Sequence, residues 1–383
     1  MISAIARRWS RLRLRSRLIY LFLAAVAVWF SVAAIIQWCG DTWPARAVLT
    51  DPMCVFPLAF SPDGRTLLTA GGSEMTTWDV GSGRRGKTWA IKGSGHPEQG
   101  TFSPDGKTFA AGVFAFPGPL SIDLFDTATG QTRASFATNR RTIMHLAFAP
   151  DGRTLRAYLG DNPQIKSCSS WNRSFAADLL EVVTLDTATG LQVSSRQLTT
   201  PTRGAITAIT LDGKIMAIAD RKTTVQLWDL DSDSSLGNLS TTSATVYAAM
   251  GFSDDGQTLA IGRMNGTVEL WDVPGLRLMK TLPAIAGGFA FRMLRFAPDG
   301  RSLALTGYPL RKPSRVQNFE TEVRHAMGLG VADHSEIVLL EVATGHRLAG
   351  AASSVNPIYS PDGKVLATAE PDGTTRLREI AKP

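Results

Sequence analysis

The sequence from Pro57 to Ala70, PLAFSPDGRTLLTA, places the four residues SPDG at 61–64 between two apolar runs. Pro, Asp and Gly are the residues that tight turns favour, so this stretch predicts a hairpin of two β-strands. The pattern returns six more times along the chain. The further copies are SPDG at 103–106, APDG at 149–152, TLDG at 210–213, SDDG at 253–256, APDG at 297–300 and SPDG at 360–363. The chain therefore contains seven similar units.

Each turn is followed by a second landmark, a large side chain and then an acid at the end of a third run, as in TVQLWD at 224–229. A turn that contains Gly, such as DTATG at 126–130, comes next and leads to a fourth run. Four antiparallel strands in each unit predict the blades of a β-propeller. The seven pairs are Trp78-Asp79, Phe125-Asp126, Leu185-Asp186, Trp228-Asp229, Trp271-Asp272, Leu340-Glu341 and Arg378-Glu379.

On these turns and Trp-Asp pairs, residues 45–383 resemble the WD40-repeat family. The resemblance implies an all-β fold, a monomeric seven-bladed β-propeller. It does not indicate a function, because one fold hosts many unrelated activities. The residues expected to maintain the repeats are Trp78, Asp79, Trp228, Asp229, Trp271, Asp272, Asp63, Asp105, Asp151, Asp299 and Asp362.

The sequence departs from the WD40 pattern in two ways. A Gly-His dipeptide stands in the family-like place only at Gly95-His96, and four repeats have no Trp before the acid. The hydrogen-bonded tetrad associated with WD40 blades is therefore not expected in most of these repeats.

The last repeat is incomplete. The chain ends at TTRLREIAKP, residues 374–383, which supplies a third strand and no fourth. The segment ARAVLT at 45–50 precedes the first SPDG in the place where fourth strands stand elsewhere. We expect it to pair with the last blade, closing the ring and removing an exposed sheet edge.

The first forty residues differ from the rest in charge. The formal net charge is +7, and six arginines (Arg7, Arg8, Arg11, Arg13, Arg15 and Arg17) lie in a segment, residues 1–40, that contains no acid. The remaining chain is nearly neutral, so the basic pI of the whole chain does not indicate a nucleic-acid partner.

Residues 18–38, LIYLFLAAVAVWFSVAAIIQW, carry no charge. A helix of that length spans roughly the 30 Å hydrocarbon core of a membrane. The arginines before it predict a cytoplasmic tail at 1–17, a single-pass signal anchor at 18–38 and a linker at 39–44. The propeller would then be extracytoplasmic. The alternative is a signal peptide cleaved near the small residues Ser31-Val32-Ala33.

The string GSGRRGKT at 81–88 matches the phosphate-loop pattern. A working phosphate loop opens a helix, whereas the residues that follow here, TWAIKGSGHP, are β-like and contain Gly and Pro. We expect a turn and no nucleotide. The sequence shows no catalytic, cofactor-binding or metal-binding constellation, so we expect a protein that is not an enzyme and holds no cofactor.

Three repeats are longer than the others between their second and third strands. The extra residues belong to the second, third and sixth units, with insertions at about 157–178 and 307–334 in the last two. In an antiparallel blade, these connections emerge on the same face as the fourth-to-first connections. The extra material should therefore gather on one face of the disc.

Aromatic and basic side chains on these insertions are the candidate partner contacts, because such residues dominate binding hot spots. The spacing of Phe319, Val323 and Met327 predicts a short amphipathic helix. The alternative is that the apolar residues only fix their loops to the disc. The candidates are Trp171, Phe175, Phe114, Phe116, Arg311, Lys312, Arg315, Phe319, Val323 and Met327.

The sequence thus predicts a non-catalytic scaffold, anchored in a membrane, that presents one face to an extracytoplasmic protein or peptide. Two alternatives use the mouth of the central channel: a quinone-dehydrogenase-like enzyme, which the DTATG turns at 126–130 and 186–190 resemble, and a sensor of glycans or small molecules. The dehydrogenase repeats carry a Trp shortly after the Thr-Gly, and none follows here.

Overall fold

The computed structural model describes fourteen parts of the chain, and the predicted tail at 1–17, the predicted anchor at 18–38 and most of the linker lie outside them. The described residues are 43–51, 56–91, 95–114, 120–138, 142–160, 180–198, 206–219, 224–240, 247–283, 285, 288–310, 335–352, 355–370 and 372–380. Two units are distinguished, Met1–Pro44 and Ala45–Pro383. The described part of the chain contains no helix that is long and apolar enough to cross a membrane.

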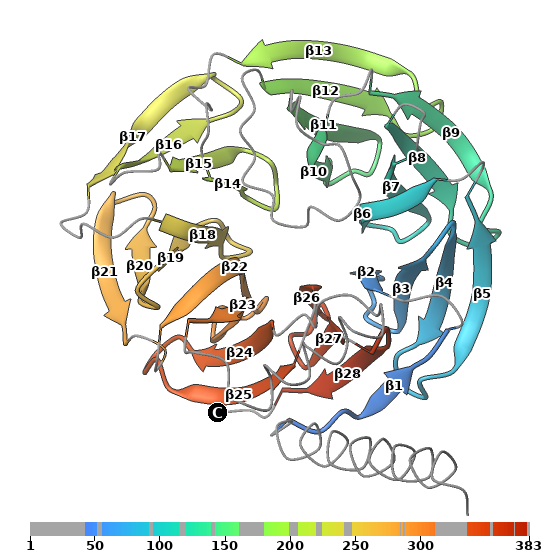
Figure 1. Ribbon diagram of the computed structural model, residues 1–383. Helices are drawn as coiled ribbons and strands as arrows, with labels where there is room; N and C mark the ends of the chain where they lie inside the picture. Colours follow the sequence, from blue (N-terminus) through green and yellow to red (C-terminus); the bar gives the residue numbers. More distant parts are fainter. Residues whose placement is uncertain are drawn as a thin grey trace, which may run out of the picture. The chain divides into compact units, whose positions relative to one another are not determined.

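The second unit is all-β. Its described residues form 28 strands in seven sheets of four (Figure 1). The first three blades contain β2 (Phe56–Phe60), β3 (Thr66–Gly71), β4 (Glu74–Asp79) and β5 (Arg85–Ala90); β6 (His96–Phe102), β7 (Thr108–Phe114), β8 (Ser121–Asp126) and β9 (Thr132–Ala137); and β10 (Thr142–Phe148), β11 (Thr154–Gly160), β12 (Leu180–Asp186) and β13 (Gln192–Leu198).

Blades 4 and 5 contain β14 (Ile206–Ile209), β15 (Ile215–Ala219), β16 (Thr224–Asp229) and β17 (Ser234–Ser240), then β18 (Tyr247–Phe252), β19 (Thr258–Arg263), β20 (Val268–Asp272) and β21 (Arg277–Leu282). Blade 6 contains β22 (Phe289–Phe296), β23 (Ser302–Pro309), β24 (Glu336–Glu341) and β25 (Arg347–Ala352). Blade 7 contains β26 (Val355–Tyr359), β27 (Val365–Ala369), β28 (Thr375–Glu379) and β1 (Ala47–Leu49). The predicted seven-bladed propeller is confirmed.

The first strand of the propeller closes the ring. β1 pairs antiparallel with β28, placing Val48 opposite Arg376, and Figure 1 shows blue β1 continuing the red sheet of blade 7. The side chain of Leu49 is fully buried in a cluster with apolar residues of blades 1 and 7. The seventh blade thereby gains the fourth strand that its own repeat lacks, as the incomplete last repeat predicts.

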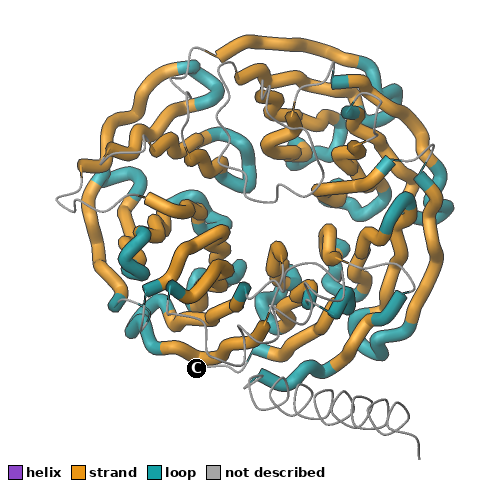
Figure 2. Tube along the Cα trace, viewed as in Figure 1, coloured by secondary structure: helices purple, strands orange, loops and turns teal. Residues whose placement is uncertain are grey.

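The SPDG stretch forms the turn between the first and second strands. Ser61 donates its hydroxyl hydrogen to the Asp63 carboxylate at 2.6 Å, and this carboxylate also accepts the Arg65 N–H at 3.0 Å. Gly64 has φ +69°, a left-handed conformation that suits a residue without a Cβ atom. Figure 2 shows these turns as loops between pairs of strands. The repeated sequence therefore encodes a repeated hydrogen-bonded turn.

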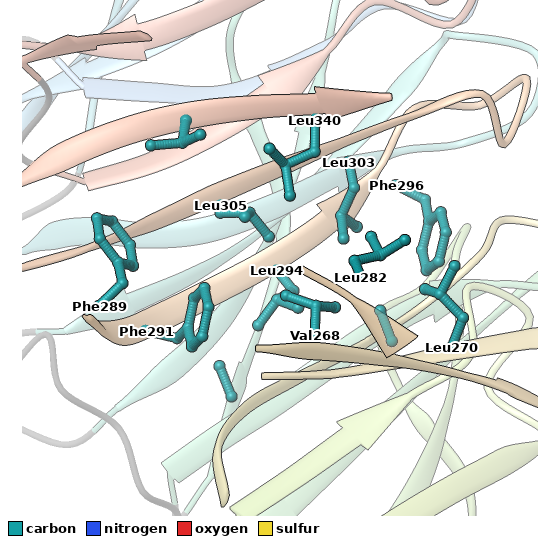
Figure 3. Packing of buried hydrophobic residues seen from close by; sticks show 13 residues of the cluster. Val268, Leu270, Leu282, Phe289, Phe291, Leu294, Phe296, Leu303, Leu305 and Leu340 are labelled. Atoms are coloured by element: carbon teal, nitrogen blue, oxygen red, sulfur yellow. The ribbon is translucent and has the colours of Figure 1, made fainter. Parts of the chain in front are cut away.

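Apolar residues of neighbouring blades pack against each other to form the core. Between blades 5 and 6, Val268, Leu270 and Leu282 share one cluster with residues of β22 and β23, and Leu270 lies beside Phe296 (Figure 3). Burying one such side chain contributes about 1.5–3 kcal/mol. Because similar clusters lie between other pairs of blades, packing between sheets fixes the order of blades around the ring.

Two of the expected insertion boundaries need correction. β11 continues to Gly160 and β23 to Pro309, so the first residues of the expected insertions at 157–178 and 307–334 belong to strands. Tyr158 and Leu159 are buried against neighbouring sheets, which explains why the strand continues. The rest of each insertion up to 179 and 334 lies outside the described residues.

The GSGRRGKT stretch forms the turn after β4 and then enters β5, as expected. Gly83 takes φ +69° in this turn. Lys87, the lysine of the phosphate-loop pattern, donates to the Ala128 carbonyl of blade 2 at 2.7 Å. The lysine thus links two blades, and no helix follows the glycines within the described part of this stretch.

Candidate functional site

The three tryptophans of the Trp-Asp pairs each use a different hydrogen-bond acceptor. Trp78 donates its indole N–H to Thr69 at 2.8 Å, Trp228 to Asp233 at 3.0 Å, and Trp271 to Glu269 at 3.1 Å. His96 instead contacts the Gly72 carbonyl of blade 1 at 2.9 Å through Nδ1. Blades 1, 4 and 5 therefore each hold their tryptophan with a different nearby acceptor.

In blade 7, Arg378 occupies the position that holds Trp78 in blade 1. Its buried guanidinium donates to Glu370 at 3.1 Å and to Thr368 at 3.4 Å. Burial raises the pKa of Glu370, and the positive charge of Arg378 opposes that rise. Removing one member of such a pair leaves an uncompensated buried charge, so this pair is part of the blade's structure.

The acids of the third-to-fourth turns are bound to their own turns. Asp79 accepts the backbone N–H of Ser82 at 2.7 Å and its hydroxyl at 2.6 Å, and Asp126 accepts the equivalent groups of Thr129. These hydrogen bonds lower the pKa of both aspartates. The carboxylates stabilise turns, which is the role that the repeat pattern predicts for Asp79. Asp229 accepts the backbone N–H of Ser232 at 2.8 Å, and Asp272 accepts from Arg277 at 2.9 Å.

The acids of the first turns are used in the same way. Asp63, Asp105 and Asp362 each accept a serine hydroxyl, which lowers their pKa. Asp151 and Asp299 follow Ala149 and Ala297 and accept only a backbone N–H among the contacts described, at 2.9 and 3.0 Å. All five predicted aspartates therefore lie in turns.

Of the ten predicted partner contacts, only Phe114 lies within the described residues. It is the last residue of β7 and is half-buried, at the start of the lengthened connection of blade 2. The predictions for Trp171, Phe175, Phe116, Arg311, Lys312, Arg315, Phe319, Val323 and Met327 lie outside the described residues. The ends of β7, β11 and β23 do lie on one face, because all three are second strands of equivalent blades.

The two alternatives that use the mouth of the central channel, an enzyme and a small-molecule sensor, have little support among the described residues. No group of three or more His, Cys, Asp and Glu side chains there could hold a metal ion. His145, on the inner strand β10, has its pKa lowered to about 4 by burial, although a contact with the Leu211 backbone opposes the shift. Its ring lies 5.8 Å from that of Tyr158, centroid to centroid, so it packs between blades 3 and 4.

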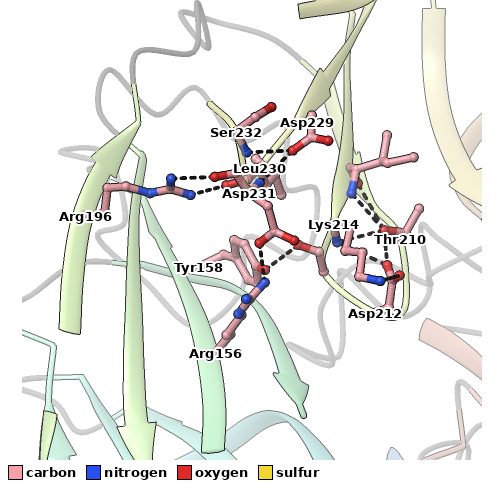
Figure 4. Close-up of polar contacts among 12 residues, drawn as sticks. Arg156, Tyr158, Arg196, Thr210, Asp212, Lys214, Asp229, Leu230, Asp231 and Ser232 are labelled. Atoms are coloured by element: carbon pink, nitrogen blue, oxygen red, sulfur yellow. Dashed lines mark hydrogen bonds and ion pairs between the residues drawn. The ribbon is translucent and has the colours of Figure 1, made fainter. Parts of the chain in front are cut away.

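A cavity that the sequence analysis did not identify lies between blades 3 and 4. Its volume is about 320 Å³. Arg156 donates to the Asp231 carboxylate at 2.6 Å, and Arg196 donates to the Asp231 carbonyl at 2.7 Å and to the Leu230 carbonyl (Figure 4). The lining residues are Arg156, Tyr158, Val182, Thr184, Ser194, Arg196, Leu230 and Asp231. We call this cavity the 3–4 groove.

Along the groove, blade 3 carries larger or polar side chains where its sister blades carry small or apolar ones. The strand register places Arg156 at the position of Leu68 in blade 1. It places Arg196 at the position of Trp89. Fully buried equivalents of Arg156 in the other blades are Leu68, Ala110, Ala217, Ala260, Ala304 and Ala367. Aligning the seven repeats on the acid of the second landmark is the signal that would have found the groove.

Comparisons with known proteins agree with this architecture. Residues 234–272 match the family described as "WD domain, G-beta repeat". This stretch covers β17 and the first three strands of blade 5. No curated protein sequence is significantly similar to the chain.

Solved structures share the fold. A chain in the "Crystal Structure of Mitotic Checkpoint Complex" is similar with a TM-score of 0.59 and 15% identity, covering 89% of this chain and 93% of that one. At this identity the similarity shows the fold alone. In all, 1870 chains of solved structures are significantly similar, so the architecture is too common to indicate a particular activity.

The chain is therefore a seven-bladed β-propeller. One stretch of it, residues 234–272, matches a WD40 repeat, and the similarity to the solved structure is one of fold.

Proposed function

We propose that this protein is a non-catalytic scaffold that binds a protein or peptide partner on the face where the connections of blades 2, 3 and 6 are lengthened. The observation that supports it is the placement of these connections. They run from β7 to β8, from β11 to β12 and from β23 to β24, all on one face of the ring. Loops on a rigid scaffold commonly carry binding residues.

The ends of the lengthened connections are held by packed strands. The strands that carry the lengthened connections are buried, with Leu159 and Leu180 at the two ends of the blade 3 connection almost fully covered. Phe114 is held at the end of β7. A scaffold of this kind keeps loop ends in place, which lowers the entropy that binding would otherwise cost.

The proposal includes the membrane anchor at 18–38 and a propeller on the extracytoplasmic side. The support is the uncharged segment with six arginines before it and sparse charge after it. Extraction of membranes with alkaline carbonate tests the anchor: the full chain stays in the pellet, and a variant lacking residues 1–40 leaves it. Release of the full chain into the supernatant contradicts the anchor.

The partner face is tested by affinity purification from detergent-solubilised membranes. One variant has residues 161–179 and 311–334 replaced by short Gly-Ser turns, and the matched control has the short connection 220–223 of blade 4 replaced in the same way. We expect the first variant to lose a specific protein that wild type and control retain, with melting temperatures unchanged.

A partner set identical in all three proteins contradicts the proposal. The appearance of a bound chromophore in the purified protein would instead favour a cofactor-dependent enzyme. Both results are read from the same preparation by mass spectrometry and absorbance.

A further inference from the structure

We propose that the 3–4 groove is a second binding site, which takes an acidic side chain of a peptide partner. The groove is built from β11, β12 and β13 of blade 3 and from the third-to-fourth turn of blade 4. That turn lies on the face opposite the lengthened connections. The site therefore uses none of the residues on which the proposed partner face depends.

The walls of the groove present hydrogen-bond donors. The side chain of Arg156 is 39% exposed, and its guanidinium gives one N–H to Asp231. Thr184 is half-buried and Ser194 is exposed on the same sheet face, and both carry hydroxyl groups. A carboxylate accepts hydrogen bonds from all of these groups, and its bonds with a guanidinium are the strongest of them.

Asp231 is the one acid among the residues that line the groove, and it is 46% exposed. The neighbouring acids face other groups: Asp229 accepts the N–H groups of Asp231 and Ser232, and Asp233 accepts the Trp228 indole N–H. The lining thus carries two positive charges and one negative charge. An incoming carboxylate would compete with Asp231 for Arg156.

The floor of the groove is apolar and fixed. Tyr158 is fully buried, with its hydroxyl donating to the Gly213 carbonyl of blade 4, and Val182 and Leu230 are buried beside it. A volume of about 320 Å³ suits one acidic side chain and an apolar neighbour. The ligand that fits both floor and walls is a peptide segment in which an acid adjoins an aliphatic residue.

The other blades show that stability does not require this groove. At the position of Arg196, the remaining outer strands carry an apolar residue, and five of the six pack in the clusters between blades. These residues are Leu49, Trp89, Phe136, Leu239, Leu282 and Ala351. In blade 3 this residue is the cation Arg196, and a cavity lies beside it, although packing would favour filling it.

The test is fluorescence anisotropy with a labelled peptide, Gly-Glu-Leu-Gly, and the matched peptide Gly-Gln-Leu-Gly. We expect the purified full chain to bind the Glu peptide only. Arg156→Gln should weaken binding about tenfold or more, because a charge-assisted hydrogen bond is lost. Asp231→Asn should tighten binding about fivefold, because the competing carboxylate is removed.

Arg133→Gln is the matched control. Arg133 also pairs with an acid of a third-to-fourth turn, Asp126, and it lies in blade 2, outside the 3–4 groove. This substitution should leave binding unchanged. Ser194→Ala keeps both arginines and should weaken binding even if Arg156→Gln fails to fold. Free succinate at equal concentration should not displace the peptide, because it lacks the aliphatic neighbour.

Absence of binding to the Glu peptide, or equal binding of both peptides, overturns the proposal. So does tighter binding of succinate than of peptide, which would indicate a small-molecule site. The variant with shortened loops at 161–179 and 311–334 should still bind the Glu peptide. The two proposed sites therefore fail independently of each other.

Discussion

At the scale of single residues, the first turns of blades 1, 2, 4, 5 and 7 are stabilised by a hydroxyl and a carboxylate acting together. In blade 2, Ser103 donates to Asp105 at 2.7 Å and accepts the backbone N–H of Thr108 at 2.9 Å. Both Ser103 and Thr108 are buried. The serine therefore satisfies a backbone donor that would otherwise lack an acceptor away from water.

We predict that Ser103→Ala lowers the free energy of unfolding by about 1–3 kcal/mol at neutral pH, because the Thr108 N–H loses its acceptor. The Ser103 hydroxyl also lowers the pKa of Asp105. A folded-state pKa below the unfolded value stabilises the fold above that value, and the stabilisation is lost as pH falls through the folded pKa. The difference between variant and wild type should therefore shrink from pH 7 to pH 3 in denaturant titrations.

The reverse change, Ala149→Ser in blade 3, introduces the missing hydroxyl beside Asp151 and should stabilise the protein. A Ser103→Ala effect that is independent of pH would show that the hydroxyl does not act through the carboxylate. Lys107→Ala, next to the same turn but exposed, should change stability by less than about 0.5 kcal/mol.

Some residue roles could be predicted from the sequence and others could not. The turn aspartates follow from the repeated SPDG, because the turn geometry is local. The acceptors of Trp228 and Trp271 depend on which side chains meet after folding, and no short pattern specifies them. Arg156 and Arg196 are visible only when the repeats are compared position by position.

At the scale of elements, the third-to-fourth turn of one blade packs against the outer strand of the blade before it. Gly130, at φ +73° in the blade 2 turn, lies against the indole of Trp89 on β5. A Cβ atom added there would come within 2.2 Å of the indole. Gly300, in the first turn of blade 6, has φ +68° and no heavy atom within 4 Å of such a Cβ.

We predict that Gly300→Ala costs roughly 1–2 kcal/mol, the cost of a left-handed conformation for a residue with a Cβ. Gly130→Ala pays the same conformational cost and adds overpacking of about 1–3 kcal/mol. Denaturant midpoints of the two purified variants check the order. Equal destabilisation would contradict the packing of the turn against β5.

The strands themselves could be predicted from the sequence, because turns punctuate the chain at regular intervals. The ends of β11 and β23 could not. Burial of Tyr158 and Leu159 against neighbouring sheets extends β11, and pairing with β22 extends β23 to Pro309. The short helix expected at 319–327 lies outside the described residues and remains a prediction.

In the whole molecule, the ring places different features on its two faces. Seven similar sheets pack side by side, and the lengthened connections fall on one face while the 3–4 groove involves a turn on the other. The fold could be predicted because it is repeated. The partner could not, because specificity resides in loops and in one altered blade.

Pairing of β1 with blade 7 closes the ring, and the positions of the features on both faces depend on this closure. The most direct measurement is disulfide formation between Val48→Cys and Arg376→Cys, which lie opposite each other, in a chain whose three native cysteines are replaced by serine. Opposed residues of antiparallel strands lie within disulfide reach. The control pair is Val48→Cys with Glu379→Cys, three residues out of register.

We predict that the first pair forms an intramolecular disulfide in the folded protein and that its melting temperature is higher oxidised than reduced. The control pair should stay reduced. Free thiols in the first pair under oxidising conditions, or disulfides formed only between molecules, would contradict closure of the propeller by its first strand.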